Sequence, residues 1–526
     1  MDSEVKFSTV RPTLDVIVVG AGIAGLTAAY RLQQQQPNCR VLVLEAKDRV
    51  GGRTFSTEMK GASGTDTWDL GGQWVGSTQY HLLWLMEELG LEKYPQYTTG
   101  RKQMLLGNNK GIRTYKSSIP SLSPMALLDM HRFITLTDKL SADIPLDDPM
   151  KAPNAEVLDG TTLETLIRQY TWTQEAQDAI RVSSDIISGA PPSMMSALYF
   201  MHYVRSSGNI RILVEADGDS NNSYRIKGGA QQVSKRLVER IGKEKVLLSQ
   251  PVVHIQQEEV DKVTVVTAEG REFTCRYVVV AAPIQCSADI NYTPNKPLDR
   301  IGLANHSPVG HLIKFIVTYK AAFWREDDLS GEIVSHGGKA TIRGTSSGPL
   351  HLTYDCTTSN GNPGIVGFYA NSREWSHIQP EVRRSAVLNS LAEFIGPKAK
   401  EPLDYFEKDW ALEPYNGGCP INIMTPGAMT YFYKGLRTPF GRVHWAGTET
   451  ATHHVGFMSG AVQSGLRVAS EVLTRLDPLY RGDDLLVNLD NMRDDTRKGP
   501  GWMWSVVGLV GVITVTAFLF RRFLLH

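Results

Sequence analysis

Leu14 to Gly25 read L-D-V-I-V-V-G-A-G-I-A-G, a short apolar run that passes directly into a glycine-rich turn. The β-branched residues of 14–19 predict a buried strand, and L-T-A-A-Y-R-L-Q, just beyond the turn, has the spacing of a helix. A second predicted strand, 41–44, ends on Glu45, 20 positions after Gly25. A G-x-G-x-x-G between a strand and a helix, followed by an acidic residue at this distance, is the dinucleotide-binding fingerprint.

The residues of this fingerprint have separate roles. Gly20 permits the tight turn, Gly22 lets a pyrophosphate approach the backbone, and Gly25 lets helix and strand pack closely. The helix N-terminus supplies N–H donors and a favourable dipole for the phosphates, and Glu45 is expected to accept hydrogen bonds from the adenosine ribose. The predicted cofactor contacts of this unit are Gly20, Gly22, Ile23, Ala24, Gly25, Glu45 and Ala46.

More glycine pairs follow in A-K-D-R-V-G-G-R-T after Glu45 and in D-L-G-G-Q-W-V-G at 69–76. Gly51 and Gly52 give a second close backbone approach, and the guanidinium of Arg53 can grip a phosphate. An enzyme that must release a nicotinamide cofactor seldom needs such repeated clamps, so the pattern favours tightly held FAD. The predicted contacts here are Gly52, Arg53, Gly71, Gly72, Gln73 and Trp74.

Composition excludes several classes of protein. The 526 residues are 42% hydrophobic, which is normal for a globular chain, and 55 basic residues balance 55 acidic ones. No nucleic-acid partner is indicated. The five cysteines are odd in number, widely spaced and without a C-x-x-C pair, so we expect a reducing compartment and neither disulfides nor a metal site. The N-terminus lacks the apolar core of a secretory signal.

The C-terminus predicts a membrane anchor. No charged residue occurs from Gly499 to Phe520, and about 20 apolar residues suffice to cross a bilayer. Basic residues flank this run and aromatic residues occupy one interface: Arg497, Lys498, Arg521, Arg522, Trp502 and Trp504. A buried core helix is the alternative interpretation. So near the chain's end, the span predicts a tail anchor with the catalytic domain in the cytosol, and its basic flanks favour the mitochondrial outer membrane over the endoplasmic reticulum.

The middle of the chain has no nucleotide motif from 91 to 220. Helical spacing is predicted at 163–170 and 196–204, where the stripe Leu198, Met201 and Val204 reads as core. A polar loop is expected at 215–223. The segments beyond it predict a helix at 230–241, alternating strands at 246–255 and 263–268, and a buried strand at 277–282.

Lys314 interrupts the apolar strand G-H-L-I-K-F-I-V-T-Y. Burying an unpaired ammonium is costly, so this lysine either points outward or has a partner. The pattern alone leaves both interpretations open.

Cys419 follows two glycines in Y-N-G-G-C-P-I, residues 415–421. Because glycine has no Cβ, a partner can approach this backbone closely. A thiol presented in this way suits a metal ligand, a nucleophile, a cofactor attachment point or a simple turn. Further on, V-H-W-A-G-T-E at 443–449 has the form of a strand and turn, and small residues from Gly456 begin a helix whose dipole suits negative charge on a reduced cofactor.

Together, G-A-G-I-A-G-L, V-G-G-R-T, L-G-G-Q-W-V-G, N-G-G-C and W-A-G-T-E-T-A-T-H resemble the monoamine oxidases, nearly from end to end. The resemblance implies a two-domain α/β fold with a Rossmann-like FAD-binding domain and a mixed-sheet substrate domain. It implies a bond from the Cys419 sulfur to the flavin 8α-methyl, Val252 beside the adenine, and Lys314 bonded to a water near flavin N5. The further cofactor contacts that it implies are Trp410, Gly447, Thr448, Glu449, Phe457 and Met458.

The sequence departs from that family around the substrate. Two tyrosines sandwich the amine in monoamine oxidases, and Pro420 and Phe457 occupy their positions here. His454 stands where a tryptophan is expected, and Asn416 replaces a serine. Phe457 keeps a π face for an amine, whereas Pro420 does not, so substrate preference is not carried over. The predicted catalytic residues are Lys314, Trp410, Tyr415, Pro420 and Phe457.

The resulting prediction is a membrane-anchored amine oxidase that passes two electrons from a neutral amine to FAD and then to oxygen. Its products are an aldehyde, formed through the imine, with ammonia and hydrogen peroxide. Alternatives are a polyamine or amino-acid oxidase of the same fold, a flavoprotein that binds amines with little turnover, and an NAD-dependent dehydrogenase. The resemblance leaves a homodimer open.

The predicted organisation interleaves two domains. The FAD-binding domain takes three segments, the substrate domain two, and short pieces connect them to the ends of the chain. In chain order the segments are an extension (1–13), FAD-binding (14–90), substrate (91–224), FAD-binding (225–300), substrate (301–409), FAD-binding (410–476), linker (477–498) and anchor (499–522).

Overall fold

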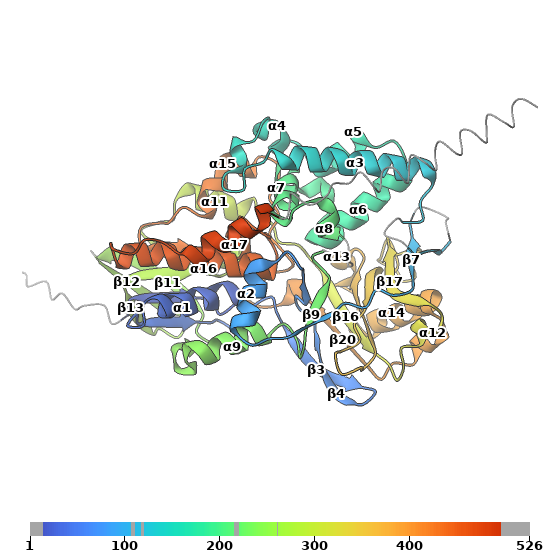
Figure 1. Ribbon diagram of the computed structural model, residues 1–526, viewed down its shortest axis with the longest axis horizontal. Helices are drawn as coiled ribbons and strands as arrows, with labels where there is room; N and C mark the ends of the chain where they lie inside the picture. The colour runs from blue at the N-terminus through green and yellow to red at the C-terminus, as the bar shows by residue number, and fades with distance from the viewer. Residues whose placement is uncertain (1–13, 107–110, 117–119, 215–219, 260, 496–526) are drawn as a thin grey trace, which may run out of the picture. The chain divides into compact units, whose positions relative to one another are not determined.

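The computed structural model describes residues 14–495, apart from 107–110, 117–119, 215–219 and 260. The chain separates into two compact units, residues 1–482 and 483–526. In the second unit the described helix is α17 (Asp484–Asp495). All other elements described below belong to the first unit (Figure 1).

A five-stranded parallel sheet forms around the glycine turn. Val16–Val19 pairs with Val41–Leu44 on one side and with Tyr277–Val280 on the other, and every residue of the central strand is buried. Continuous apolar runs of this kind suit strands covered on both faces. The order is β10 (Val246–Leu247), β2 (Val41–Leu44), β1 (Val16–Val19), β14 (Tyr277–Val280) and β21 (Val443–Trp445). The strands predicted at 14–19, 41–44 and 277–282 are confirmed.

Helix α1 (Ile23–Gln35) packs against α16 (Met458–Leu476), which joins the two ends of the first unit (Figure 1). A glycine makes this contact close, because a Cβ on Gly465 of α16 would lie 2.6 Å from the Ala24 carbonyl oxygen of α1. Another glycine lets α1 pack on the turn before it, because a Cβ on Gly25 would lie 2.1 Å from the Gly20 carbonyl oxygen. Helix α9 (Gln232–Ile241) also packs against α1, which confirms the helix predicted at 230–241.

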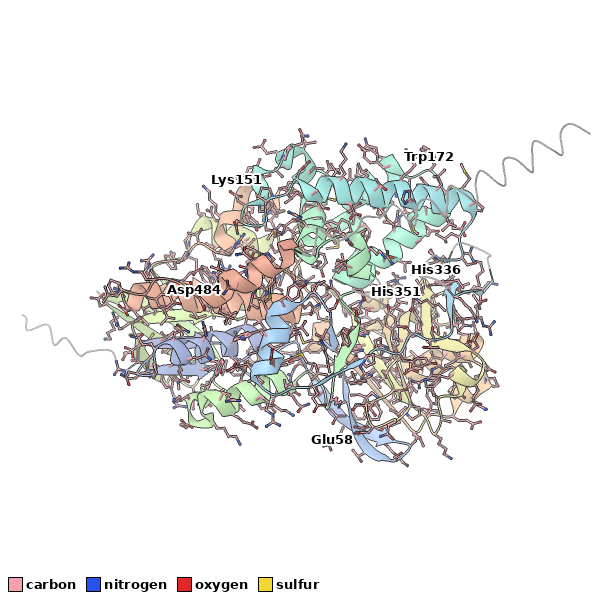
Figure 2. The ribbon with its side chains drawn as sticks, viewed as in Figure 1. Glu58, Lys151, Trp172, His336, His351 and Asp484 are labelled. Carbon is pink, nitrogen blue, oxygen red and sulfur yellow. The ribbon has the colours of Figure 1, made fainter. Side chains whose placement is uncertain are left out.

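A second, four-stranded sheet continues the chain after β10. Its order is β13 (Glu272–Cys275), β12 (Lys262–Thr267), β11 (Val252–Glu259) and β15 (Asn291–Thr293). Two smaller sheets are formed by strands that follow the glycine pairs at 51–52 and 71–72 in the chain, together with strands from elsewhere. They are the hairpin β3 (Ser56–Gly61) with β4 (Gly64–Asp69), and the set β5 (Trp74–Val75), β9 (Tyr224–Ile226) and β6 (Lys93–Pro95). In Figure 2, Glu58 marks strand β3 of this hairpin.

A seven-stranded mixed sheet lies on the other side of the cavity described below. All six residues of β16 are buried, including Lys314, so the outward-facing interpretation of this lysine is wrong. Trp324, Trp375 and Phe315 belong to the apolar core that packs on this sheet. The order is β20 (Asp404–Asp409), β16 (Ile313–Thr318), β19 (Gly364–Tyr369), β18 (Leu350–Asp355), β17 (Leu329–Ser335), β7 (Arg101–Leu105) and β8 (Arg113–Tyr115). Its helices are α12 (Phe323–Glu326), α13 (Ser372–Trp375) and α14 (Pro380–Ile395).

Helices predominate in the segment from 124 to 214 (Figure 1). Helix α7 is buried over most of its length, and Leu198, Met201 and Val204 are fully buried, which confirms them as core. Trp172 lies at the outer margin of these helices (Figure 2), with the Arg132 guanidinium 3.8 Å from its ring. The helices are α3 (Pro124–Ala142), α4 (Ala155–Asp159), α5 (Leu163–Tyr170), α6 (Gln174–Ser188), α7 (Ala197–Ser207) and α8 (Ile210–Val214). The remaining helices are α2 (Tyr80–Glu88), α10 (Ile284–Ala288), α11 (Leu298–Asn305) and α15 (Ala428–Phe432).

No helix within the described part of the chain is both long and apolar enough to span a bilayer. The predicted anchor at 499–522, the extension at 1–13 and most of the polar loop predicted at 215–223 lie outside the described residues.

Candidate active site

One cavity of about 780 Å³ runs between the parallel sheet and the mixed sheet. It collects segments that are far apart in the chain, namely the glycine turn after β1, both later glycine pairs, and the segment around Cys419. Of the predicted site residues, all except Gly25 and Glu449 line this cavity. These lining residues are Gly20, Gly22, Ile23, Ala24, Glu45, Ala46, Gly52, Arg53, Gly71, Gly72, Gln73, Trp74, Val252, Lys314, Trp410, Tyr415, Cys419, Pro420, Gly447, Thr448, Phe457 and Met458.

The glycine turn and Glu45 form one end of the cavity. The Glu45 carboxylate accepts hydrogen bonds from the backbone N–H groups of Ala21, at 2.6 Å, and Lys47, at 3.0 Å. Burial raises the pKa of Glu45, and these two N–H groups oppose the change. A Cβ on Gly22 would meet no protein atom within 4 Å, although Gly22 lines the cavity. The turn therefore leaves space for a ligand beside its backbone, as the fingerprint requires.

Arg53, which lines the cavity, forms a partly buried ion pair with Glu449. The Arg53 guanidinium lies 2.5 Å from one Glu449 oxygen and 3.1 Å from the other, and it also donates to the Pro420 carbonyl oxygen at 2.9 Å. Burial raises the pKa of Glu449, but the charge and hydrogen bonds of Arg53 outweigh it and lower the pKa. Glu449 lies behind the cavity wall, so its contact is with Arg53. Gly25 is likewise outside the lining because it packs against Gly20.

Lys314 has protein partners within the buried wall. Its Nζ donates to the Gly71 carbonyl oxygen at 2.8 Å and to Gln73 Oε1 at 2.7 Å, and it lies 5.4 Å from the Trp74 ring centroid. Desolvation lowers the pKa of Lys314 to about 7, against the opposing charge of Asp69. Near neutral pH this side chain is therefore divided between its charged and neutral forms.

Gln73 supplies a polar atom that fits a cofactor. Its Oε1 accepts from Lys314, and among the described residues its buried Nε2 has no hydrogen-bond acceptor. A buried donor without a partner costs about 1–3 kcal/mol. An acceptor atom on a bound flavin or a water beside it would satisfy this donor.

Trp410 and Cys419 border the same part of the cavity. Trp410 is buried, with its indole N–H bonded to the Leu70 carbonyl oxygen at 2.9 Å, and the Cys419 N–H donates to the Gly310 carbonyl oxygen at 2.9 Å. Burial raises the pKa of the Cys419 thiol to about 12, although Arg53 and Lys314 oppose this change. The sulfur is thus a thiol at neutral pH, and it lines the cavity.

The remaining wall is apolar and aromatic. Phe457 stacks on Tyr203, with ring centroids 6.0 Å apart and an angle of 22° between the planes. Sequence reasoning missed Tyr203 because helical spacing alone marks it as core. The other apolar residues that line this part are Trp74, Ile186, Ile187, Leu213, Leu352, Tyr354, Phe368 and Pro420.

Sequence reasoning also missed Lys47, Cys286 and Glu413, which line the cavity. Lys47 stands two residues after Glu45, and this closeness to the fingerprint acid could have indicated that it lines the cavity. Nothing in the sequence pairs it with Glu413, 366 positions later, yet Lys47 Nζ lies 2.7 Å from the Glu413 carboxylate. Tyr415 is half exposed, so it borders the cavity from the solvent side.

Comparison with known proteins agrees with this geometry. A family model described as flavin containing amine oxidoreductase matches residues 23–473. The probable flavin-containing monoamine oxidase A of Dictyostelium discoideum is 36% identical over 467 residues, which cover 88% of this chain and 98% of that protein. The structure of cyclohexylamine oxidase from Brevibacterium oxydans has a TM-score of 0.79 at 30% identity, covering 88% of this chain and all of that one. A putrescine oxidase bound to putrescine has a TM-score of 0.80 at 30% identity, with 88% and 99% covered.

Proposed function

Because this chain belongs to the flavin containing amine oxidoreductase family, we propose that it is a monoamine oxidase that uses covalently bound FAD. The overall reaction converts RCH₂NH₂, O₂ and H₂O into RCHO, NH₃ and H₂O₂. The family membership and the predicted flavin-containing amine oxidase class are confirmed. They exclude the alternative prediction of an NAD-dependent dehydrogenase.

One observation carries the proposal. A single cavity connects the dinucleotide turn at Gly22 with Lys314, Cys419 and Phe457, so a cofactor anchored at one end reaches the residues at the other. FAD would lie with its ribose against Glu45 and its ring between Cys419 and Lys314. When bound, the flavin supplies the two-electron chemistry.

The protein's own residues select and orient the amine. Phe457, Tyr203 and Phe368 form an apolar wall that excludes water. This wall favours the neutral form of the amine over its ammonium form. The π face of Phe457 orients the nitrogen, and holding the carbon in one place supplies much of the rate acceleration. Lys314, fixed by Gly71 and Gln73, presents a proton donor in the cavity wall, and this donor would serve the reduction of oxygen beside a bound flavin.

The charges around the cavity favour a monoamine over a diamine or an amino acid. A second ammonium needs a carboxylate, and the acidic side chains that line the described cavity are Glu45, Asp289 and Glu413. Glu45 and Glu413 are already bonded to Lys47. An amino-acid carboxylate needs a free cation, but Arg53 is already paired with Glu449.

The proposal includes a covalent bond between Cys419 and the flavin. Joining the Cys419 sulfur to the flavin 8α-carbon breaks one S–H and one C–H bond and releases two protons and two electrons overall. Molecular oxygen accepts them and becomes hydrogen peroxide, so the step balances with the same co-substrate as turnover. Support comes from the position of Cys419 on the cavity wall, beside glycines 417 and 418, whose φ angles are +70° and +147°.

Location is also proposed. The apolar run 499–520 with its basic flanks supports a tail anchor in the mitochondrial outer membrane, with residues 14–482 facing the cytosol.

A panel of amines with peroxide detection tests this function. We expect peroxide from primary arylalkyl or cycloalkyl monoamines, and less than a tenth of that rate from diamines and from amino acids. Peroxide from putrescine-like diamines alone would favour a polyamine oxidase. A flavin-loaded protein that makes no peroxide with any amine would favour the amine-binding flavoprotein.

A further inference from the structure

The cavity wall that carries Cys419 is a thin segment, here called the cysteine strap (residues 411–420). Every strap residue except Gly418 lines the cavity. Leu412 and Tyr415 are nevertheless 70% and 51% exposed to solvent. The strap is therefore a single layer of chain between the cofactor cavity and solvent, and something must hold it closed.

Glu413, in the strap, is paired with three cationic side chains. Its carboxylate accepts from Lys47 at 2.7 Å, from Arg49 at 2.6 Å and from Lys408 at 2.5 Å. Only 12% of its side chain is exposed. Hydrogen bonds from ionised donors to an ionised acceptor are about twice as strong as neutral ones. Three cations around one largely buried carboxylate thus form a strong cluster of ion pairs, here called the Glu413 tie.

The three cations come from two different places. Lys408 lies on β20, five residues before Glu413, whereas Lys47 and Arg49 lie just after β2. Burial raises the pKa of Glu413, but hydrogen bonds from Lys408, Lys47 and Arg49 outweigh it and lower the pKa to about 2. The tie is therefore ionised throughout the neutral range, and it joins the strap to the segment that follows β2 and Glu45.

Lys47 extends the tie in both directions. Its backbone N–H donates to Glu45 at 3.0 Å, and its Nζ bonds to Asn416 as well as to Glu413. One lysine thus connects the acid that faces the ribose with a residue three positions before Cys419.

The other side of Cys419 is tied as well. The Pro420 carbonyl oxygen accepts from Arg53 at 2.9 Å, and Arg53 is held by Glu449. Between the two ties lie Gly417 and Gly418, whose positive φ angles suit glycine and which have the widest conformational freedom of any residue type. Without the Glu413 tie, the chain before Cys419 could move away from the cavity.

We propose that Glu413 is a positioning residue that latches the cysteine strap, retains FAD before attachment, and sets the Cys419 sulfur at the distance where the bond to the flavin forms. The proposal rests on the covalent attachment proposed above. The latch proposal adds Glu413 and its three cationic partners as the residues that make attachment efficient.

The first test measures covalent flavin in Glu413→Gln, as the absorbance that stays with the protein after acid precipitation. We expect at least a threefold loss of the covalent fraction relative to the unaltered protein. Glu407→Gln is a matched control, since Glu407 is on the same strand as Lys408, is 11% exposed, and pairs with Arg383 at 2.6 Å without lining the cavity. This control should keep its covalent flavin.

The second test measures FAD affinity where no bond can form. In Cys419→Ser, adding Glu413→Gln should weaken FAD binding at least tenfold by equilibrium titration, whereas adding Glu407→Gln should not. Lys408→Met removes one of the three cations and should give an intermediate weakening, which covers the case in which Glu413→Gln fails to fold.

The outcomes separate the two proposals. If the unaltered protein releases its flavin in acid, covalent attachment fails, and the affinity test alone decides the latch. The latch is overturned if Glu413→Gln changes neither covalent fraction nor affinity, or if Glu407→Gln changes them equally.

Discussion

At the scale of single residues, Lys314 shows how burial creates a titrating group. The side chain is buried and fixed by Gly71 and Gln73, and desolvation lowers its pKa to about 7. A surface lysine would stay charged to about pH 10. We expect the charged form to stabilise the negative charge that develops on oxygen as it is reduced.

Lys314→Met should therefore slow reoxidation of the reduced flavin by about 100-fold, as loss of one preorganised donor does in other enzymes. In the unaltered protein the reoxidation rate should fall as pH rises through about 7, because the ammonium loses its proton. Stopped-flow mixing with oxygen across pH 6–9 measures both. A pH dependence that survives in Lys314→Met would assign the titration to another group.

Phe457 is predicted to hold the substrate through its ring. It stacks on Tyr203, and such aromatic contacts contribute about 0.5–1.5 kcal/mol beyond buried area. Phe457→Ala should raise KM for arylalkyl amines by up to about tenfold, while Phe457→Tyr, which keeps the ring, should change it little. Steady-state peroxide assays provide the comparison, and equal effects of the two variants would argue against ring recognition.

At the scale of elements, two glycines of the same turn should respond in opposite ways to enlargement. A Cβ on Gly22 would enter open space in the cavity, whereas one on Gly25 would collide with the Gly20 carbonyl oxygen. Gly22→Val should leave the free energy of unfolding of the apoprotein within about 0.5 kcal/mol but abolish FAD binding.

Gly25→Val should instead destabilise the protein by 3 kcal/mol or more, about the upper range for overpacked cores. Urea unfolding and flavin titration of both variants give the comparison. Retained FAD binding in Gly22→Val would mean that the pyrophosphate does not approach this turn.

Much of the element order could be predicted from the sequence, because local patterns determine it. Apolar runs at 14–19, 41–44 and 277–282 became neighbouring strands of one sheet, and the glycine fingerprint located the turn between β1 and α1. The orientation of Lys314 could not be predicted, since it depends on the opposite sheet face being covered. Trp74, from a distant part of the chain, covers the side of the sheet that carries Lys314, and Phe368 lies beside Lys314 on the neighbouring strand β19.

The same reason explains what was missed at the site. Glu413 meets Lys47 only because β2 and the cysteine strap lie on one cavity, and no local pattern connects charges 366 positions apart. Glu449 was expected to contact the cofactor because its turn does so in the resembling family. In this structure it reaches Arg53 instead.

At the scale of the whole molecule, residues 14–482 contain the entire described cavity, and the predicted anchor follows separately. A protein ending at Arg497 should therefore keep its flavin and its amine oxidation, yet remain in the supernatant after high-speed centrifugation without detergent. The full chain should sediment with membranes. A truncated protein that still needs detergent would place the membrane contact elsewhere.

The central claim is that one cavity joins FAD to an amine site, and anaerobic titration of the purified full chain tests it most directly. Adding a primary monoamine without oxygen should bleach the flavin absorbance completely, and readmitting oxygen should restore it with one hydrogen peroxide per flavin. A flavin that keeps its colour with every monoamine, or a protein that binds no flavin when FAD is supplied, would contradict the account.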